Sequence, residues 1–306
     1  MLREAFYWIL NMSIIATVYG LLLYALRYIK SCPRTVIYVL WGVVVIRMLC
    51  PVSFSSKLSL MNILSRLSGT TMVKTVPIED LSLSLTNTIQ RAAAYQPIAY
   101  KSSAWENFIT VASMIWLVFA LAGILAMCIL YGLTRSELKK AVLLRDNLYE
   151  GPMVNSPTVI GILHPRIILP LDMDDKNLAY ILLHERIHIA RRDNLWRMIA
   201  ILAACIHWFN PMSWVFLKLF LYDCELACDE GAIKKLKLEE RKEYARTLLN
   251  YADGERTMFS SAFGSNKVKL RVVQVLSYRR LTWFSVLYFS LLMVSIVVLL
   301  LTNGMV

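Results

Sequence analysis

The chain has 306 residues, of which 58% are apolar and 18% are charged, and its mean hydropathy is +0.54. These values exclude an ordinary soluble domain and, because the apolar residues lie in long blocks, predict a predominantly α-helical, polytopic membrane protein. The formal net charge of +12 does not indicate nucleic-acid binding, because the basic residues are not gathered in one stripe.

Four apolar blocks are long enough to cross a hydrocarbon core of about 30 Å. Residues 1–53 hold the first two, residues 107–133 form the third, and residues 282–306 hold the fourth and a short outer tail. The second block is the weakest candidate because it contains Arg47. The first block lacks a basic start and a small-residue cleavage site, so we expect a span and not a cleavable signal peptide.

The distribution of basic residues predicts how these spans are oriented in the cell membrane. Lysine and arginine are concentrated in the short loop 27–34 and in the segment after Arg135, and cytoplasmic loops carry such an excess. We therefore expect residues 54–106 to form an extracytoplasmic loop and residues 134–281 to lie in the cytoplasm, with both termini outside. Six cysteines without a paired framework fit a reducing compartment, and we expect no disulfides.

The cytoplasmic region begins with short runs of β-branched residues. Residues 158–163 and 166–169 are such runs, and the glycines and prolines around them are typical of the ends of small strands. The next segment, residues 174–202, opens with two aspartates and has helical periodicity throughout, which predicts one continuous helix. This helix carries the sequence LLHERIHIARRDN.

The apolar stretch 196–222 is interrupted by Asn210 and Pro211. Proline divides it into two pieces of about a dozen residues, each shorter than a membrane is thick. The sequence therefore predicts a re-entrant hairpin, helices lying at the membrane interface, or a helical hairpin packed on the spans. A charge-rich helical segment, a polar loop and a basic helical stretch follow before the last span.

His184, Glu185 and His188 form an HExxH pattern on the predicted helix. The two histidines project about 40° apart and one turn along the helix, so both imidazoles can reach one metal ion. Glu185 lies about 100° around from His184, where it can contact a metal-bound water as a general base. A chance pattern on a solvated helical face is the less favoured interpretation, because the chain has only four histidines.

A catalytic zinc ion needs a third protein ligand and an open position for water. Glu225 can be that ligand, and Asp229, four residues later, can accept a hydrogen bond from the second nitrogen of a ligand histidine. Cys224 and Cys228 have the same spacing, and two histidines with two cysteines would form a closed, structural site. We favour Glu225 because Glu185 would have no purpose in a closed site.

The choice of ligands constrains the path of the apolar stretch 196–222. If this stretch crossed the membrane once, His184 and Glu225 would lie on opposite sides and could not share a metal ion. It must therefore return to the cytoplasmic side, which leaves the total at four spans.

Five segments together resemble the membrane-integral zinc peptidases typified by the bacterial β-lactam sensor-transducers. The segments are RMLCPVSFSSKLSLMN, SPTVIGILHPRIILP, HERIHIARRDNLW, HWFNPMSWVF and DCELACDEGA. The resemblance implies a cytoplasmic α+β domain of gluzincin type that binds one Zn²⁺ per chain. Carried over by position, it implies His184, His188 and Glu225 as zinc ligands, Glu185 as the base and Asp229 as the partner of a ligand.

The expected activity is that of a zinc metalloendopeptidase which cuts peptide bonds at the cytoplasmic face of the membrane. In the resembling receptors the substrate is a cytoplasmic transcriptional repressor or the receptor itself, and self-cleavage here would fall in the polar loop 256–267. An edge strand within residues 158–169 could hold an extended substrate. The outer loop 54–106 is where we expect a partner protein or a second copy of the chain to bind.

The sequence departs from those receptors in one respect and leaves three alternatives open. The receptors carry an outer penicillin-binding domain after the last span, whereas this chain stops there, so we do not expect it to sense β-lactams. The segment SELK at residues 136–139 fits the S-x-x-K pattern of such domains only by coincidence. The alternatives are a quality-control peptidase of the heat-shock or prenyl-protein type, a non-catalytic transducer with structural zinc, and a carrier in which the motif is incidental.

Overall fold

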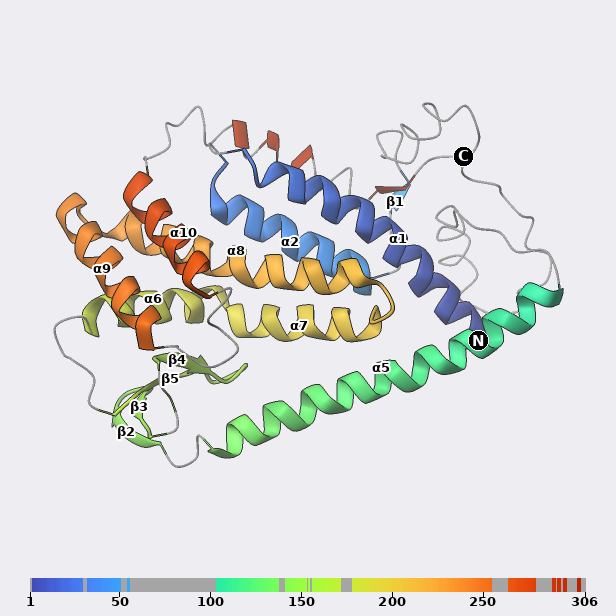
Figure 1. Cartoon of the computed structure of the whole chain (residues 1–306), viewed down its shortest axis with the longest axis horizontal. Helices are drawn as coiled ribbons and strands as arrows, with labels where there is room; N and C mark the ends of the chain where they lie inside the picture. The colour runs from blue at the N-terminus through green and yellow to red at the C-terminus, as the bar shows by residue number, and fades with distance from the viewer. Residues whose placement is uncertain are drawn as a thin grey trace.

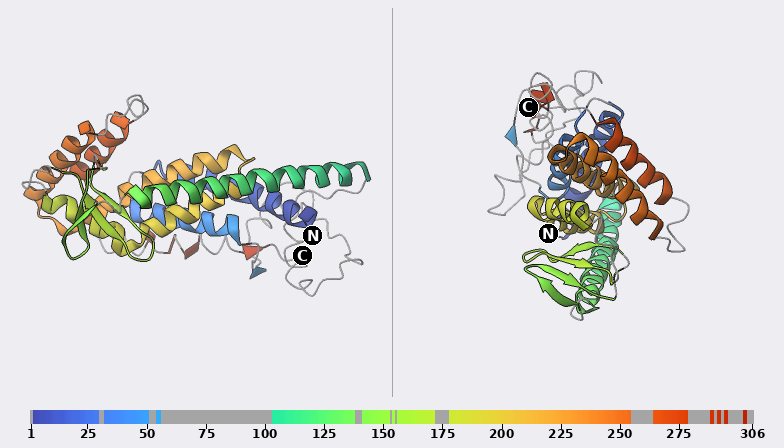
Figure 2. Two further views of the ribbon diagram at one scale, coloured as in Figure 1. Left: turned by 90° about the horizontal axis from the view of Figure 1, so that it is seen from below. Right: turned by 90° about the vertical axis from the view of Figure 1, so that its left-hand side faces the viewer.

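The structure is a computed structural model that is predominantly helical and elongated (Figure 1). It describes residues 2–29, 32–50, 54–55, 103–137, 141–152, 154, 156–171, 178–254, 264–278, 288–289, 291–292, 294–295 and 302–303. The helices are α1 (Leu2–Leu26), α2 (Arg34–Leu49), α5 (Ser103–Glu137), α6 (Leu178–Arg191), α7 (Asp193–Ile206), α8 (Pro211–Lys235), α9 (Leu238–Gly254) and α10 (Gly264–Ser277). Helices α1, α2, α5, α7 and α8 lie lengthwise beside one another, and α6, α9, α10 and a small sheet gather at one end (Figures 1 and 2).

Among the described residues, two helices are long and apolar enough to cross a membrane, namely Leu2–Leu26 and Phe108–Ser136 within α5. They coincide with the first and third predicted spans. Large apolar side chains stay exposed along α5, including Phe108, Val118 and Leu130 at 64% each, as a lipid-facing helix requires. The fourth predicted span lies almost entirely outside the described residues, as does the predicted outer loop.

Helix α2, the second predicted span, lies in the middle of the largest apolar core. Ile37, Leu40 and Trp41 are 0% exposed, and the Trp41 ring contacts the Phe216 ring of α8 at a centroid distance of 5.5 Å. Arg47, the residue that weakened this span in the sequence, is 1% exposed, and its guanidinium donates to the Cys50 carbonyl (3.2 Å). The core therefore surrounds α2, whereas α5 carries many exposed apolar side chains.

The apolar stretch 196–222 forms a helical hairpin of α7 and α8. Asn210 begins α8 by accepting a hydrogen bond from the Met212 amide (2.9 Å), and Pro211 follows as the first helical residue. Two polar groups of the turn bond to the other apolar helices: the Asn210 amide donates to Ser13 Oγ in α1 (2.8 Å), and Trp116 of α5 donates to the carbonyl of Ile206 (2.8 Å). The hairpin is thus packed on the predicted spans.

Two helix boundaries differ from the sequence prediction. The helix expected over residues 174–202 is broken at Arg192, whose left-handed backbone (φ +56°) separates α6 from α7. The second apolar piece instead continues into the charged segment as one 25-residue helix, α8, and the rest of that segment forms α9. The four candidates downstream of the HExxH motif, Cys224, Glu225, Cys228 and Asp229, therefore lie on the C-terminal half of α8.

A four-stranded sheet precedes the HExxH helix. Its strands are β2 (Val142–Arg145), β3 (Leu148–Glu150), β4 (Thr158–Ile160) and β5 (Arg166–Leu169), in the order β2-β3-β5-β4. The predicted strand 166–169 is confirmed and the predicted strand 158–163 is shorter than expected. Only the β3–β5 pair is parallel, and β4 forms one edge beside α6. Two further strands, β1 (Phe54–Ser55) and β6 (Thr302–Asn303), pair in parallel.

Candidate metal centre

Helices α6 and α8 bring together the residues that the HExxH pattern singled out. His184, Glu185 and His188 of α6 are all buried, at 8%, 9% and 5% exposure. The two helices approach closely at Gly231, where an added Cβ would lie 3.3 Å from Ile187 Cγ2. A side chain at position 231 would require Ile187 to shift by a few tenths of an ångström, so this glycine permits the close packing of α8 on α6.

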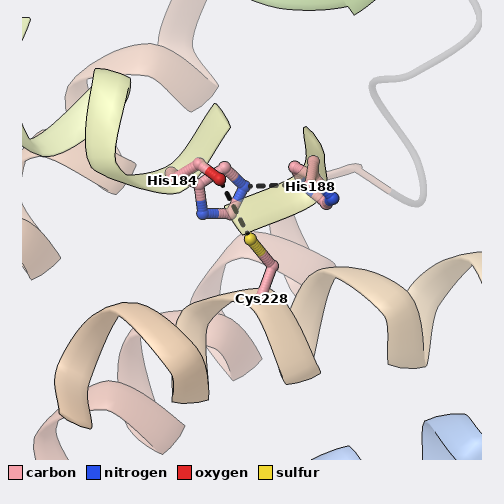
Figure 3. Close-up of side chains that lie close together, drawn as sticks. All are labelled: His184, His188 and Cys228. Carbon is pink, nitrogen blue, oxygen red and sulfur yellow. Dashed lines mark hydrogen bonds between the residues drawn. The ribbon is translucent and has the colours of Figure 1, made fainter. Parts of the chain in front are cut away.

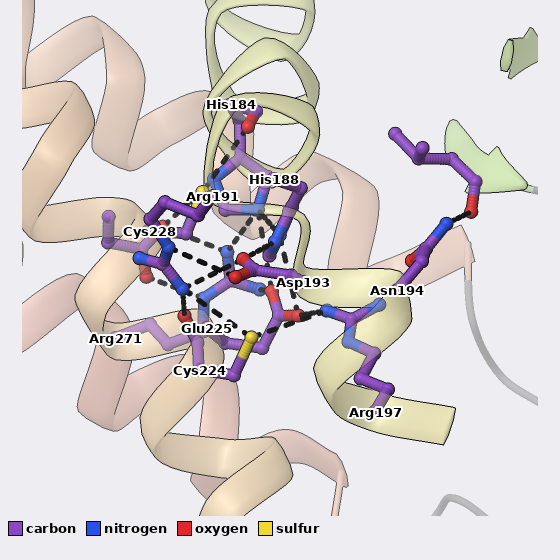
Figure 4. A network of polar contacts seen from close by, with 12 residues as sticks. His184, His188, Arg191, Asp193, Asn194, Arg197, Cys224, Glu225, Cys228 and Arg271 are labelled. Carbon is purple, nitrogen blue, oxygen red and sulfur yellow. Dashed lines mark hydrogen bonds and ion pairs between the residues drawn. The ribbon is translucent and has the colours of Figure 1, made fainter. Parts of the chain in front are cut away.

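The three predicted ligands converge on one point (Figure 4). His184 Nε2 lies 3.1 Å from His188 Nε2, Glu225 Oε2 lies 3.4 Å from His184 Nε2, and Glu225 Oε1 lies 3.5 Å from His188 Nε2. Ligand atoms about 2.0–2.1 Å from a tetrahedral zinc ion are about 3.3 Å from one another. The imidazole nitrogens are close to this spacing, and each lies near this distance from one of the two Glu225 oxygens, so the three side chains could hold a zinc ion between them.

The cysteines offer a second set of donors at the same place. Cys228 is fully buried and its thiol donates to the His184 carbonyl (3.2 Å), as Figure 3 shows. The ligand atoms of His184, His188 and Cys228 lie within 4.8 Å of one another, and so do those of His188, Asp193 and Cys224. The alternative of a sulfur ligand therefore has a geometric basis beside the carboxylate contacts of 3.4 and 3.5 Å.

Asp193, which the sequence analysis missed, orients His188. Its Oδ2 lies 2.6 Å from His188 Nδ1, and its Oδ1 accepts a hydrogen bond from the Tyr38 hydroxyl of α2 (2.7 Å). Burial raises the pKa of Asp193, but the hydrogen bond with His188 and the charge of Arg191 lower it by more, so the net shift is downward. The carboxylate can then only accept, so His188 Nδ1 carries the proton and its Nε2 lone pair faces the metal position.

His184 is oriented by Tyr244 together with Asp229. Its Nδ1 lies 2.8 Å from the Tyr244 hydroxyl, which donates to Asp229 Oδ1 (2.7 Å), while the direct distance from Nδ1 to Asp229 Oδ1 is 3.3 Å. Burial raises the pKa of Asp229, but the neighbouring Arg271 guanidinium outweighs this and holds the pKa well below its usual range. Asp229 therefore lies where the sequence predicted, but Tyr244 shares its task.

Two arginines neutralise the acidic side of the site, and neither was predicted. Arg271 of α10 binds Asp229 through Nε (2.7 Å) and Nη2 (2.9 Å), and its Nη2 also lies 3.4 Å from His184 Nε2. Arg197 of α7 lies 2.5 Å from Glu225 Oε1, and Arg271 Nη1 lies 3.5 Å from Glu225 Oε2. The site is consequently assembled from α6, α7, α8, α9 and α10, with Tyr38 of α2 behind Asp193.

Glu185 lies against the ligand cluster without belonging to it. Burial raises its pKa from the ordinary value, and this upward effect exceeds the opposing influence of His184 and His188. A carboxylate whose pKa is raised is a better proton acceptor, which is what a general base requires.

Residues 7–275 match the family described as BlaR1 peptidase M56. The chain belongs to this family. It is 30% identical over 141 residues to the regulatory protein BlaR1 of Bacillus licheniformis. That alignment covers 43% of this chain and 24% of the relative. It is 28% identical over 136 residues to the methicillin resistance mecR1 protein of Staphylococcus aureus strain Mu50. This alignment covers 41% of this chain and 23% of the relative.

Membership of the M56 family confirms the resemblance found in the sequence. The family match and the two apolar helices of span length together indicate a membrane protein of metallopeptidase type. The alignments reach only about a quarter of the length of the curated relatives. Within this M56 chain, the HExxH histidines, Glu225 and their partners all fall inside the matched residues 7–275.

The Tyr38 hydroxyl should contribute to metal affinity, because it holds the Asp193 carboxylate that orients His188. We expect Tyr38→Phe to weaken zinc binding on the order of tenfold, as the loss of a partner of a metal ligand does. Zinc affinity would be measured by competition with a chromogenic chelator on the detergent-purified chain. Tyr28→Phe, at a tyrosine with 70% exposure, is the matched control and should not change the affinity; equal affinities for both variants would contradict this role of Tyr38.

Proposed function

We propose that this M56 chain is a zinc-dependent endopeptidase that cuts peptide bonds at the cytoplasmic face of the membrane. The observation that supports the proposal best is the convergence of His184 Nε2, His188 Nε2 and a Glu225 carboxylate within 3.1–3.5 Å of one another. A closed site needs no base, whereas here Glu185 is buried directly beside the ligands.

His184, His188 and Glu225 would hold the zinc ion, and Asp193 and Tyr244 would keep the two imidazoles in the tautomer that binds it. When bound, zinc lowers the pKa of a water molecule towards about 7 and polarises a carbonyl group. Glu185 would be the group that accepts a proton from the attacking water and returns it to the leaving amine. Arg271, with donors 3.4 Å from His184 Nε2, is the residue we propose to stabilise the negative charge that develops on the attacked carbonyl oxygen.

The proposed place for an extended substrate is the edge strand β4, which lies beside α6. Part of this edge is already bonded, because the Asn194 amide donates to the carbonyls of Val159 (2.9 Å) and Gly161 (3.2 Å). A substrate strand would have to replace Asn194 there or pair with the neighbouring residues of the edge. This arrangement also fixes β4 to the first turn of α7, and thereby to the metal site.

The proposed biological role is regulated proteolysis of a cytoplasmic protein, such as a transcriptional repressor, or of the chain itself. The polar loop 256–267, proposed for self-cleavage, lies mostly outside the described residues, between the end of α9 at Gly254 and the start of α10 at Gly264. The outer loop 54–106 remains the proposed contact for a partner or a second copy. A non-catalytic transducer with structural zinc is the second candidate, because Cys228 lies within 4.8 Å of both histidines.

Removal of the metal should abolish proteolysis. The full chain, reconstituted in lipid nanodiscs, would be incubated with a quenched fluorescent peptide library and treated with a zinc chelator. We expect the rate of cleavage to fall to background and to return when zinc is restored in slight excess. Cleavage that persists after verified removal of zinc would contradict the proposed mechanism.

Self-cleavage should depend on Glu185 of the same chain. We expect wild-type cells under an inducing condition to accumulate a fragment that ends within residues 256–267, and Glu185→Gln cells to contain only the intact chain. The measurement is mass spectrometry of the affinity-purified N-terminal fragment. If wild-type protein stays intact under every condition while an added substrate is cut, the loop is an ordinary linker.

A further inference from the structure

A cavity of about 730 Å³ lies between the C-terminal end of α5 and one face of the sheet. Tyr131 and Arg135 line it from α5, and Tyr149, Arg166 and Ile168 line it from β3 and β5. In the strand register Tyr149 lies opposite Ile168, so both project from the same face of the sheet. The residues of the metal centre do not line this cavity, which is therefore a second site.

The lining of the cavity holds two guanidinium groups, those of Arg135 and Arg166, and the described residues that line it include no carboxylate. Within the described part of the chain, no carboxylate forms an ion pair with Arg135 or Arg166, although Arg166 stacks on the Tyr149 ring at 5.0 Å from its centroid. Two guanidinium groups without an acidic partner that face one cavity indicate an anionic ligand, and their planar donors suit a phosphate.

The position of the cavity along α5 indicates that this phosphate belongs to a lipid headgroup. The candidate span ends at Ser136, so Arg135 lies in its last turn and Tyr131 one turn earlier, the places where arginine and tyrosine anchor a helix at the membrane interface. Large apolar side chains on this side of the sheet are exposed: Leu163, which lines the cavity, by 86%, and Leu143, which pairs with Tyr149 and projects from the same face, by 55%. A polar headgroup in the cavity would thus have apolar surface next to it for acyl chains.

We propose that this cavity binds the headgroup of an anionic phospholipid from the leaflet at the C-terminal end of α5. Arg135 and Arg166 bind the phosphate, the Tyr131 and Tyr149 phenols lie beside it, and Leu163 contacts the acyl chains. The bound lipid fastens the sheet, whose edge strand β4 adjoins α6, to the membrane surface. This proposal rests on the proposed membrane placement of the chain and not on the zinc chemistry.

Native mass spectrometry of the detergent-purified full chain, titrated with phosphatidylglycerol or phosphatidylcholine, tests the proposal. We expect retention of phosphatidylglycerol on the order of tenfold stronger than of phosphatidylcholine, and loss of this preference in an Arg135→Gln, Arg166→Gln double variant. The matched control is Arg145→Gln with Arg246→Gln, two arginines whose side chains are 87% and 71% exposed, and it should keep the preference. Equal melting temperatures of the variants would show that the double variant is folded.

Three results would overturn the proposal. Equal retention of both lipids by the wild type would show that the cavity does not select an anionic headgroup. Displacement of phosphatidylglycerol by millimolar inorganic phosphate would assign the cavity to a free anion. A raised KM for a cleaved peptide in lipid-free detergent, caused by the double variant and not by the control, would assign the cavity to the substrate. Zinc content is read from the same samples, so a failure of the metal centre would be recognised separately.

Discussion

Replacing Glu185 by glutamine is expected to lower the rate of peptide cleavage by about 100-fold to 10,000-fold while leaving about one zinc ion per chain. The amide cannot accept the proton of the attacking water, but it has nearly the same shape as the carboxylate, and Glu185 is not one of the converging ligand groups. The rate would be measured with the chain in nanodiscs, and the zinc content by mass spectrometry of the elements. This variant therefore separates chemistry from metal binding.

Glu239→Gln is the control for this experiment, because it makes the same chemical change at an exposed glutamate of α9. It should leave both the rate and the zinc content unchanged. A Glu185→Gln chain that still cuts at the wild-type rate would rule out Glu185 as the base. A variant that does not cut but keeps full signalling output in cells would instead favour the non-catalytic transducer.

The parts of the site that the sequence predicted are those set by a single helix. His184, Glu185 and His188 follow from the periodicity of α6, and the hairpin follows from Asn210 and Pro211 because proline cannot continue a helix but can begin one. Glu225 needed more than periodicity, since its choice over the cysteines depended on the purpose of Glu185 and on the family resemblance. Periodicity and the properties of proline were therefore sufficient to predict the features that lie within a single helix or at its end.

The residues that were missed depend on tertiary contacts or on an unusual backbone. Asp193 reaches His188 only because Arg192 adopts a left-handed conformation, and non-glycine residues seldom do so. Tyr244 and Arg271 are 60 and 87 residues away from His184 in the chain, and nothing in their own segments marks them. The hairpin of β2 and β3 did have a signal, the Asp146–Asn147 pair at its turn.

The contacts behind the ligands connect the metal centre to the apolar helices. His188 is linked through Asp193 to Tyr38 of α2, and His184 is linked through Asp229 to Arg271 of α10. Asp223 of α8 also accepts hydrogen bonds from Trp41 (2.7 Å) and Arg27 (3.0 Å), which fix α8 to the first two helices. A shift of α2 relative to α8 would therefore disturb both the orientation of a ligand histidine and the position of Glu225.

Replacing Glu225 by alanine is expected to reduce the zinc content of the purified chain to less than about a tenth of one ion. The change removes one of three ligands, and it also leaves Arg197 and Arg271 facing the histidines without the carboxylate that now lies 2.5 Å and 3.5 Å from them. Both effects weaken the binding of a cation. Zinc would be measured after dialysis against a weak chelator, alongside the melting temperature, since an unfolded variant would also lose the metal.

The decisive comparison is with the Cys224→Ser, Cys228→Ser double variant, which should keep about one zinc ion. Cys228 donates to the His184 carbonyl, and serine can make the same hydrogen bond, so the fold of α8 should survive the change. If zinc is lost in the Glu225 variant and kept in the double-cysteine variant, the fourth coordination position is open to water, as hydrolysis requires. Zinc that is lost with the cysteines and kept without Glu225 would identify a closed site, and Glu185 would then have no water to activate.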